Sequence, residues 1–80
     1  MIQVWKCDAT EAGCQLILHP PPGEADLLTL VRVCRGRGWS VPGVAVFPNR
    51  LAEVNVGGAT PAELRDAFSG EPGFDFSGCS

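Results

Sequence analysis

The residues of this chain with the most distinctive chemistry are four cysteines and one histidine: Cys7, Cys14, His19, Cys34 and Cys79. Successive cysteines are separated by six, 19 and 44 residues, so the sequence contains no C-x-x-C pair. A tetrahedral zinc site usually takes two ligands from one short loop, with roughly two to four residues between them. The spacing therefore does not favour zinc, although a hairpin that brought Cys7 beside Cys14 would allow a site completed by two of the other three residues. We expect no cofactor.

Each cysteine also has a simpler interpretation. Cys34 shares a helical stripe with leucine and valine, where a free thiol packs as a small hydrophobic group, so His19 and Cys79 are the candidates to complete a zinc site. A cross-strand disulfide between Cys7 and Cys14 is disfavoured in a reducing cytosol unless it is transient or redox-sensing. Cys79 falls in a tail that we expect to be exposed and open to oxidation. A structural zinc site or a thiol redox module is thus the alternative function.

Catalysis would need a base beside a nucleophile or a pair of acidic groups, and the sequence offers little of either. His19 adjoins a proline run at a strand end and would have to meet Cys7 or Cys14 to activate a thiol. A surface or half-buried histidine is the simpler interpretation. The acidic residues are scattered or explained by helix starts, so no acid–base pair stands out. We predict no catalytic residue and no enzyme.

Aromatic and arginine side chains are the residues most suited to binding a partner. The candidates are Trp5, Arg32, Arg35, Arg37, Trp39, Phe74 and Phe76. Tryptophan and arginine dominate the energetics of interfaces when they lie on the surface, and the three arginines beside a tryptophan would suit an anionic partner. The arginines also have a structural explanation, because positive side chains near a helix C-terminus stabilise the helix.

Apolar runs at residues 2–7 and 14–19 predict a β-hairpin with a polar loop. We expect Cys7 to face Cys14 across this hairpin, which leaves apolar side chains, Trp5 among them, on both of its faces. Such a ribbon needs cover on both sides or a partner on one.

A second hairpin is predicted for residues 44–47 and 51–56, because the intervening Pro-Asn-Arg suits a short turn. Phe47 is expected to pair with Leu51. That pairing places on one face, expected to be core, the residues Val44, Val46, Ala52, Val54 and Val56.

Each hairpin is followed by one helix. The first is expected from Glu24 to Gly36 or Gly38, where apolar residues recur at helical spacing between an acidic start and a basic end. The second begins at Thr60-Pro61-Ala62-Glu63, which supplies an N-cap, a first-turn proline and a capping box, and it ends near Gly70.

The order of elements is therefore β-β-α-β-β-α. We predict an α+β, two-layer fold with a four-stranded, mainly antiparallel sheet and two helices on one face. Residues 1–80 form a single domain, in which a hairpin-helix half at 1–38 is followed by a second at 39–70. Residues 71–80 are expected to be an irregular tail that its two phenylalanines pin to the body.

The composition narrows the class of protein. A chain of 80 residues that is 45% hydrophobic and 19% charged suits one globular core. A formal net charge of -3 argues against sequence-independent nucleic-acid binding, which needs a surplus of positive charge. No apolar run approaches the roughly 20 residues of a membrane span, and the first residues do not resemble a secretory signal, so we expect a cytoplasmic protein.

The function predicted from these observations is that of a small non-catalytic binding protein. It would act stoichiometrically on a protein partner through an open sheet face or edge, as accessory regulators and inhibitors from viruses or mobile elements do. We expect a monomer or a small homodimer.

Overall fold

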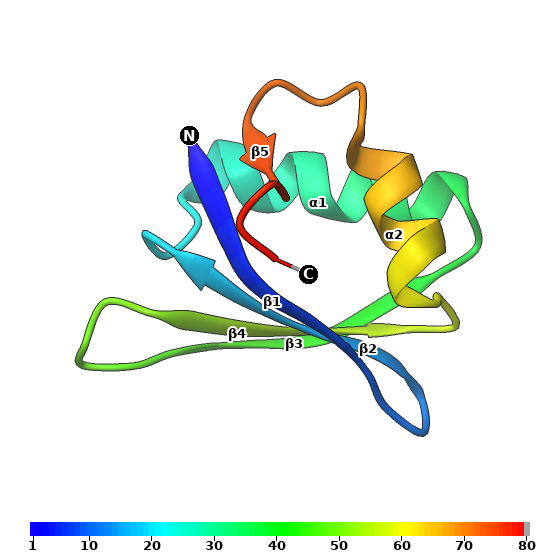
Figure 1. Ribbon diagram of the computed structural model, residues 1–80, viewed down its shortest axis with the longest axis horizontal. Helices are drawn as coiled ribbons and strands as arrows, with labels where there is room; N and C mark the ends of the chain where they lie inside the picture. The colour runs from blue at the N-terminus through cyan, green and yellow to red at the C-terminus, as the bar shows by residue number, and fades with distance from the viewer. Residues whose placement is uncertain (80) are drawn as a thin grey trace.

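The computed structural model describes residues 1–79 and contains two helices and five strands (Figure 1). In chain order these are β1 (Ile2–Ala9), β2 (Gly13–His19), α1 (Glu24–Gly36), β3 (Ser40–Val46), β4 (Ala52–Gly57), α2 (Pro61–Phe68) and β5 (Phe74–Asp75). The α+β class and the β-β-α-β-β-α order of the main elements are confirmed. Both helices lie on one face of the sheet, as expected, and the other face stays open (Figure 1).

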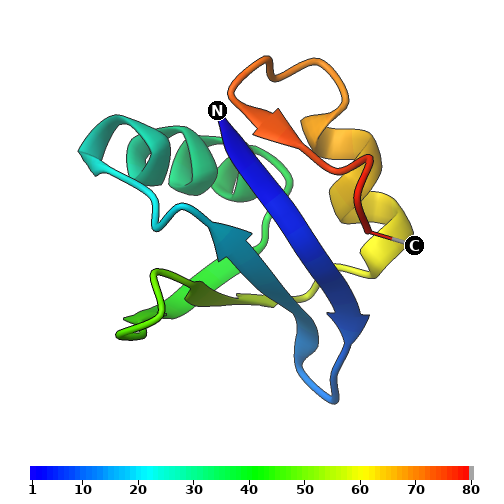
Figure 2. The same cartoon turned by 60° about the vertical axis from the view of Figure 1, so that its left-hand side comes forward.

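The sheet differs from the prediction in having a fifth strand. The strand order is β3-β4-β2-β1-β5, and β5 runs parallel to β1, so the sheet is mixed rather than purely antiparallel. The Ile2 N–H donates to the Gly73 carbonyl at 2.8 Å, which holds the tail beside the first strand (Figure 2). Because β5 pairs only Phe74 and Asp75 with β1, the pattern is too short to be recognised in sequence.

The two helices form where their capping signals predict. The first helix starts with Glu24 and Asp26 in its first turn and ends at Gly36. In the second, the Thr60 hydroxyl accepts a hydrogen bond from the Glu63 N–H, and the Glu63 carboxylate accepts one from the Thr60 N–H, which completes the capping box. The apolar faces of both helices meet the sheet in one core, which includes these fully buried side chains: Phe68, Leu16, Leu18, Leu30, Leu64, Val4, Val54, Val56, Cys14 and Cys34.

The register of the first hairpin corrects the prediction that Cys7 faces Cys14. Cys14 pairs with Ala9, and Cys7 pairs with Leu16. An irregularity between Val4 and Lys6 inserts one extra residue, Trp5, into β1. Both cysteines are buried on the helix-covered face because Cys7 lies opposite Leu16, and the bulged Trp5 is exposed on the other face.

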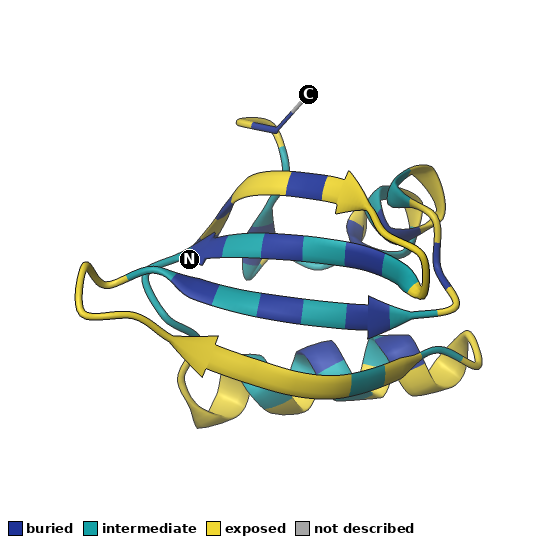
Figure 3. Ribbon diagram, turned by 90° about the horizontal axis from the view of Figure 1, so that it is seen from below, coloured by how far each residue is buried: buried dark blue, intermediate teal, exposed yellow. Residues whose placement is uncertain are grey.

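The second hairpin has the predicted register but not the predicted burial. Phe47 donates to the Leu51 carbonyl at 2.8 Å, and the pairs continue through Val46 with Ala52 and Val44 with Val54. The residues of β4 on this face are buried, yet Val44 and Val46 are 39% and 62% exposed. The expectation that both valines are core is wrong because β3 is the edge strand of the sheet (Figure 3).

The C-terminal tail is anchored more firmly than expected. Phe74 is buried, and its ring lies 4.9 Å from the ring of Phe68 between centroids. Phe76 contacts the same ring at 5.6 Å. Pinning of the tail by its phenylalanines is confirmed, but Cys79 is buried at 9% exposure, which corrects the prediction that it is exposed. The tail packs against α2 because the rings of Phe74 and Phe76 both contact the ring of Phe68.

Candidate functional site

One face of the sheet is left open by the two helices (Figure 3). Neither α1 nor α2 covers it, so side chains that alternate with the core residues of β1, β2 and β4 remain accessible to a partner. Its side chains divide into an apolar half and a polar half. The apolar half, here called the Trp5 patch, consists of Trp5, Ile17, His19 and Leu51.

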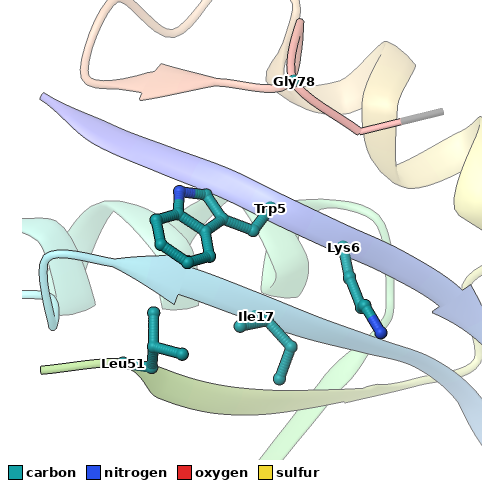
Figure 4. Close-up of a pocket in the computed structure, with 5 residues that line it drawn as sticks. All are labelled: Trp5, Lys6, Ile17, Leu51 and Gly78. Carbon is teal, nitrogen blue, oxygen red and sulfur yellow. The ribbon is translucent and has the colours of Figure 1, made fainter. Parts of the chain in front are cut away.

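The Trp5 patch is built around an exposed indole. Trp5 is 48% exposed, and its ring stacks on the imidazole of His19 with 5.0 Å between ring centroids and 28° between ring planes. Figure 4 shows Trp5 of β1, Ile17 of β2 and Leu51, which precedes β4, gathered on this side of the sheet. These residues line a shallow hollow of about 500 Å³. Lys6 lies at the rim of this hollow. A wide, apolar depression with one charged group at its margin suits a protruding side chain of another protein.

The polar half of the open face is a cross-strand hydrogen-bond network. Glu53 of β4 accepts a hydrogen bond from the Gln15 amide of β2, and its second oxygen accepts one from Asn55 at 3.4 Å. Across the strands, Ile17 of β2 lies opposite Lys6 of β1 on one side and Glu53 of β4 on the other. A cation and an anion therefore flank Ile17 at the centre of the Trp5 patch. This arrangement fixes the side chains around the Trp5 patch and adds donors and acceptors at its border.

The thiols of Cys7, Cys14 and Cys34 lie in the core as protonated groups at neutral pH. Burial raises the pKa of Cys7 to about 11, because a thiolate there would lose hydration and would lie near Cys14 and Cys79, with a smaller opposing effect of the Arg65 charge. Burial alone raises the pKa of Cys34 to about 11. Burial also raises the pKa of Cys14, whose thiol donates to the Ala59 carbonyl at 3.0 Å. The core assignment of Cys34 is confirmed, and these thiols have little thiolate character.

The predicted metal residues are only partly brought together. Cys7, Cys14 and Cys79 are neighbours on the helix-covered side, whereas His19 lies across the sheet against Trp5. Within residues 1–79, no group of three His, Cys, Asp or Glu side chains has an arrangement suited to a metal ion. The same separation keeps His19 from acting as a base for Cys7 or Cys14.

The predicted basic patch is dispersed by ion pairs and by packing. Arg32 binds the Glu71 carboxylate at 2.9 Å, and Arg37 lies 3.8 Å from Asp66. The Arg37 guanidinium also lies 5.8 Å from the centre of the Trp39 ring, a half-buried group that packs on the core. Arg35 remains exposed. Since two of the three arginines already face carboxylates, this region lacks the concentrated positive charge that an anionic partner would need.

Of the aromatic candidates, Trp5 alone has the exposure of an interface anchor. Phe74 belongs to the core and Phe76 is half-buried against Phe68, so both serve the fold. Ile17 and Leu51, which sequence reasoning did not select, complete the patch. The apolar excess on the second face of the first hairpin was a signal for Ile17, but no feature of the sequence shows that Leu51 lies beside it.

Comparison with known proteins adds no relative: no family model, no curated protein and no solved structure matches this chain. None of the helices described for residues 1–79 is long and apolar enough to cross a membrane. The fold and the candidate site define a small α+β domain with a one-sided sheet and an exposed aromatic patch.

Proposed function

We propose that this protein is a small, non-catalytic binding protein that acts stoichiometrically on a protein partner through the Trp5 patch. The observation that carries the proposal is the half-exposed indole of Trp5, which projects with Ile17 from a rigid sheet next to a shallow apolar hollow. A tryptophan held in this way loses little conformational entropy when it is buried by a partner, and such residues contribute most to binding at interfaces.

The chemistry of the remaining residues agrees with binding rather than turnover. The buried thiols of Cys7 and Cys34 have raised pKa values, and His19 is engaged with the Trp5 ring. A cytoplasmic location, in which the thiols stay reduced, and a role as an accessory regulator or inhibitor of a larger protein are parts of this proposal.

Site-specific photocrosslinking in the native cell tests this function directly. A photoreactive phenylalanine analogue at Leu51 lies inside the Trp5 patch, and the same analogue at Glu11 lies in the exposed β1–β2 loop as a matched control. We expect one discrete crosslinked protein at Leu51 and none at Glu11, and the Trp5→Ala substitution should abolish the adduct.

The partner recovered in this way is then titrated against purified protein. A one-to-one complex that Trp5→Ala weakens by about 30-fold or more is the expected result, since hot-spot residues contribute roughly 2 kcal/mol or more. Equal crosslinking at both positions, or an affinity that does not depend on Trp5, would exclude the Trp5 patch as the binding surface. Conversion of a substrate by the purified protein alone would exclude the non-catalytic function.

A further inference from the structure

The edge strand β3 has features that the Trp5 patch does not explain. Among the six large hydrophobic side chains that are exposed within residues 1–79, three belong to β3 or its hairpin turn, namely Val44, Val46 and Phe47. A fourth, Leu28, belongs to α1, the helix that contacts β3. Exposed apolar side chains are thus concentrated along β3 and its turn.

The backbone of β3 presents a free set of hydrogen-bonding groups along this edge. The Phe47 N–H donates to the Leu51 carbonyl, so the backbone of Phe47 is directed toward β4, and this direction alternates from residue to residue along an antiparallel strand. Ala45 and Gly43 therefore also direct their N–H and C=O groups toward β4. Val44 and Val46 direct theirs away from the sheet, where another extended strand can pair with them.

The opposite edge of the sheet, formed by β5 and β1, is protected against pairing with another strand, so β3 is the edge available for such pairing. Beside β1 lies the short strand β5, and the remainder of β1 carries the charged residues Lys6 and Asp8. Charged side chains on an edge oppose pairing with other strands. By contrast, residues 40–47 contain no charged residue, so this strand can lie against an identical strand without repulsion.

We propose that β3 pairs antiparallel with β3 of a second copy of this chain, about a two-fold axis at Ala45. This register places Val44 opposite Val46 of the second copy and satisfies the outward N–H and C=O groups of both valines in each copy. Pro42 then falls opposite Pro48 of the second copy, and because neither has an N–H the ladder ends there. Moving the two-fold axis to Val44 or to Val46 would place a valine opposite Pro42 or Pro48 of the second copy. The carbonyl of that valine would then have no N–H donor.

Side-chain packing agrees with the same register. Ala45 meets Ala45 of the second copy in a pair without hydrogen bonds, where the backbones approach most closely and a small side chain fits. The four valines gather on the helix-covered face, next to the α1 helices. This dimer uses a different surface from the proposed function, so either proposal can fail while the other holds.

Sedimentation equilibrium of the wild-type chain between about 1 and 500 µM provides the first test. We expect a reversible monomer–dimer equilibrium. Val44→Pro removes an N–H that points away from β4, so the fold should persist by circular dichroism while the dimer dissociation constant rises by about 100-fold. The matched control Val44→Thr keeps the backbone donor and should retain the dimer. A monomer at all concentrations, or a dimer that Val44→Pro does not weaken, would overturn the proposal.

A charge pair tests the register and does not depend on tolerance of proline. The double variant Val44→Lys with Val46→Lys sets lysine against lysine across the interface and should be monomeric. Val44→Lys with Val46→Glu sets lysine against glutamate in this register alone and should restore the dimer. Equal association of the two double variants would contradict pairing about Ala45.

Discussion

The stack of the Trp5 indole on the His19 imidazole, with 5.0 Å between ring centroids, joins the bulged residue of β1 to the last residue of β2. A half-exposed side chain without such a contact can sample several rotamers. The imidazole holds the indole in one orientation, and this orientation leaves the indole half exposed for a partner.

We expect Trp5 and His19 to be energetically coupled in the isolated protein. A double-mutant cycle with Trp5→Ala, His19→Ala and the double variant should give a coupling energy of about 0.5–1.5 kcal/mol, because stacked rings contribute beyond the area that they bury. Urea unfolding of the four proteins measures the free energies of unfolding. Strictly additive losses would show that the stack does not position the indole.

Alkaline pH should destabilise the fold through the buried thiols. The pKa values of Cys7 and Cys34 are raised from 9.0 to about 11 in the folded chain. As the pH rises from 9 to 11, the unfolded chain therefore releases thiol protons that the folded chain keeps. The free energy of unfolding falls by about 1.4 kcal/mol per pH unit for each such thiol, and below pH 9 this loss is absent.

Guanidinium unfolding at pH 8 and pH 10, followed by tryptophan fluorescence, measures this loss. The chain has no tyrosine and one lysine, so few other side chains titrate in this range. Cys34→Ala removes one of the three buried thiols whose pKa is raised and should reduce the pH dependence while lowering stability at pH 8. An identical pH dependence in the variant and the wild type would show that Cys34 titrates normally.

The capping box of α2 should contribute to stability in two separable ways. Thr60→Ala removes the hydroxyl that accepts from the Glu63 N–H and should cost about 1 kcal/mol, whereas Thr60→Ser should cost much less. The hydrogen bond from the Thr60 N–H lowers the pKa of Glu63 below 4.5, so its contribution is present above this pH and disappears as the pH falls through the lowered pKa. Glu63→Gln should therefore flatten the acid side of the stability profile in thermal unfolding.

Glycine is required at the start of β2 but not at the end of α1. A side chain at Gly13 would collide with the Val56 carbonyl on the neighbouring strand, while one at Gly36 would meet no atom within 4 Å. We expect Gly13→Ala to lower the free energy of unfolding by about 2 kcal/mol or more. Gly36→Ala should be neutral or stabilising by up to about 1 kcal/mol. Equal midpoints of chemical unfolding for Gly13→Ala and Gly36→Ala would show that the space around the two glycines does not determine the cost of a side chain.

Local signals predicted the elements of this fold well. The capping box at Thr60 and the acidic start at Glu24 predicted where the helices begin, because these signals act within one helical turn. The pairing of Phe47 with Leu51 followed from a short turn with proline and asparagine, and the structure confirms it.

Arrangements that depend on distant parts of the chain were beyond sequence reasoning. The first hairpin turns at residues 10–13, closer to Cys14 than expected, so Ala9 rather than Cys7 pairs with Cys14. The bulge at Trp5 then shifts the register by one residue further along β1, and one inserted residue is invisible in a pattern of alternation. Whether Val44 is buried depends on strand order, and β3 lies at the edge only because β4 pairs with β2. Trp5 was selected from its residue type, but its neighbour Leu51 required the pairing of β4 with β2.

The parallel contact between β1 and β5 affects how the chain folds. The hydrogen bond from Ile2 to the Gly73 carbonyl joins segments near opposite ends of the sequence. Forming it requires closure of a loop that includes every other element, and contacts of this kind slow folding relative to local ones. The hairpins and helices can form early, whereas docking of Phe74 on Phe68 belongs to the last step, so substitutions at Phe74 should speed unfolding more than they slow folding.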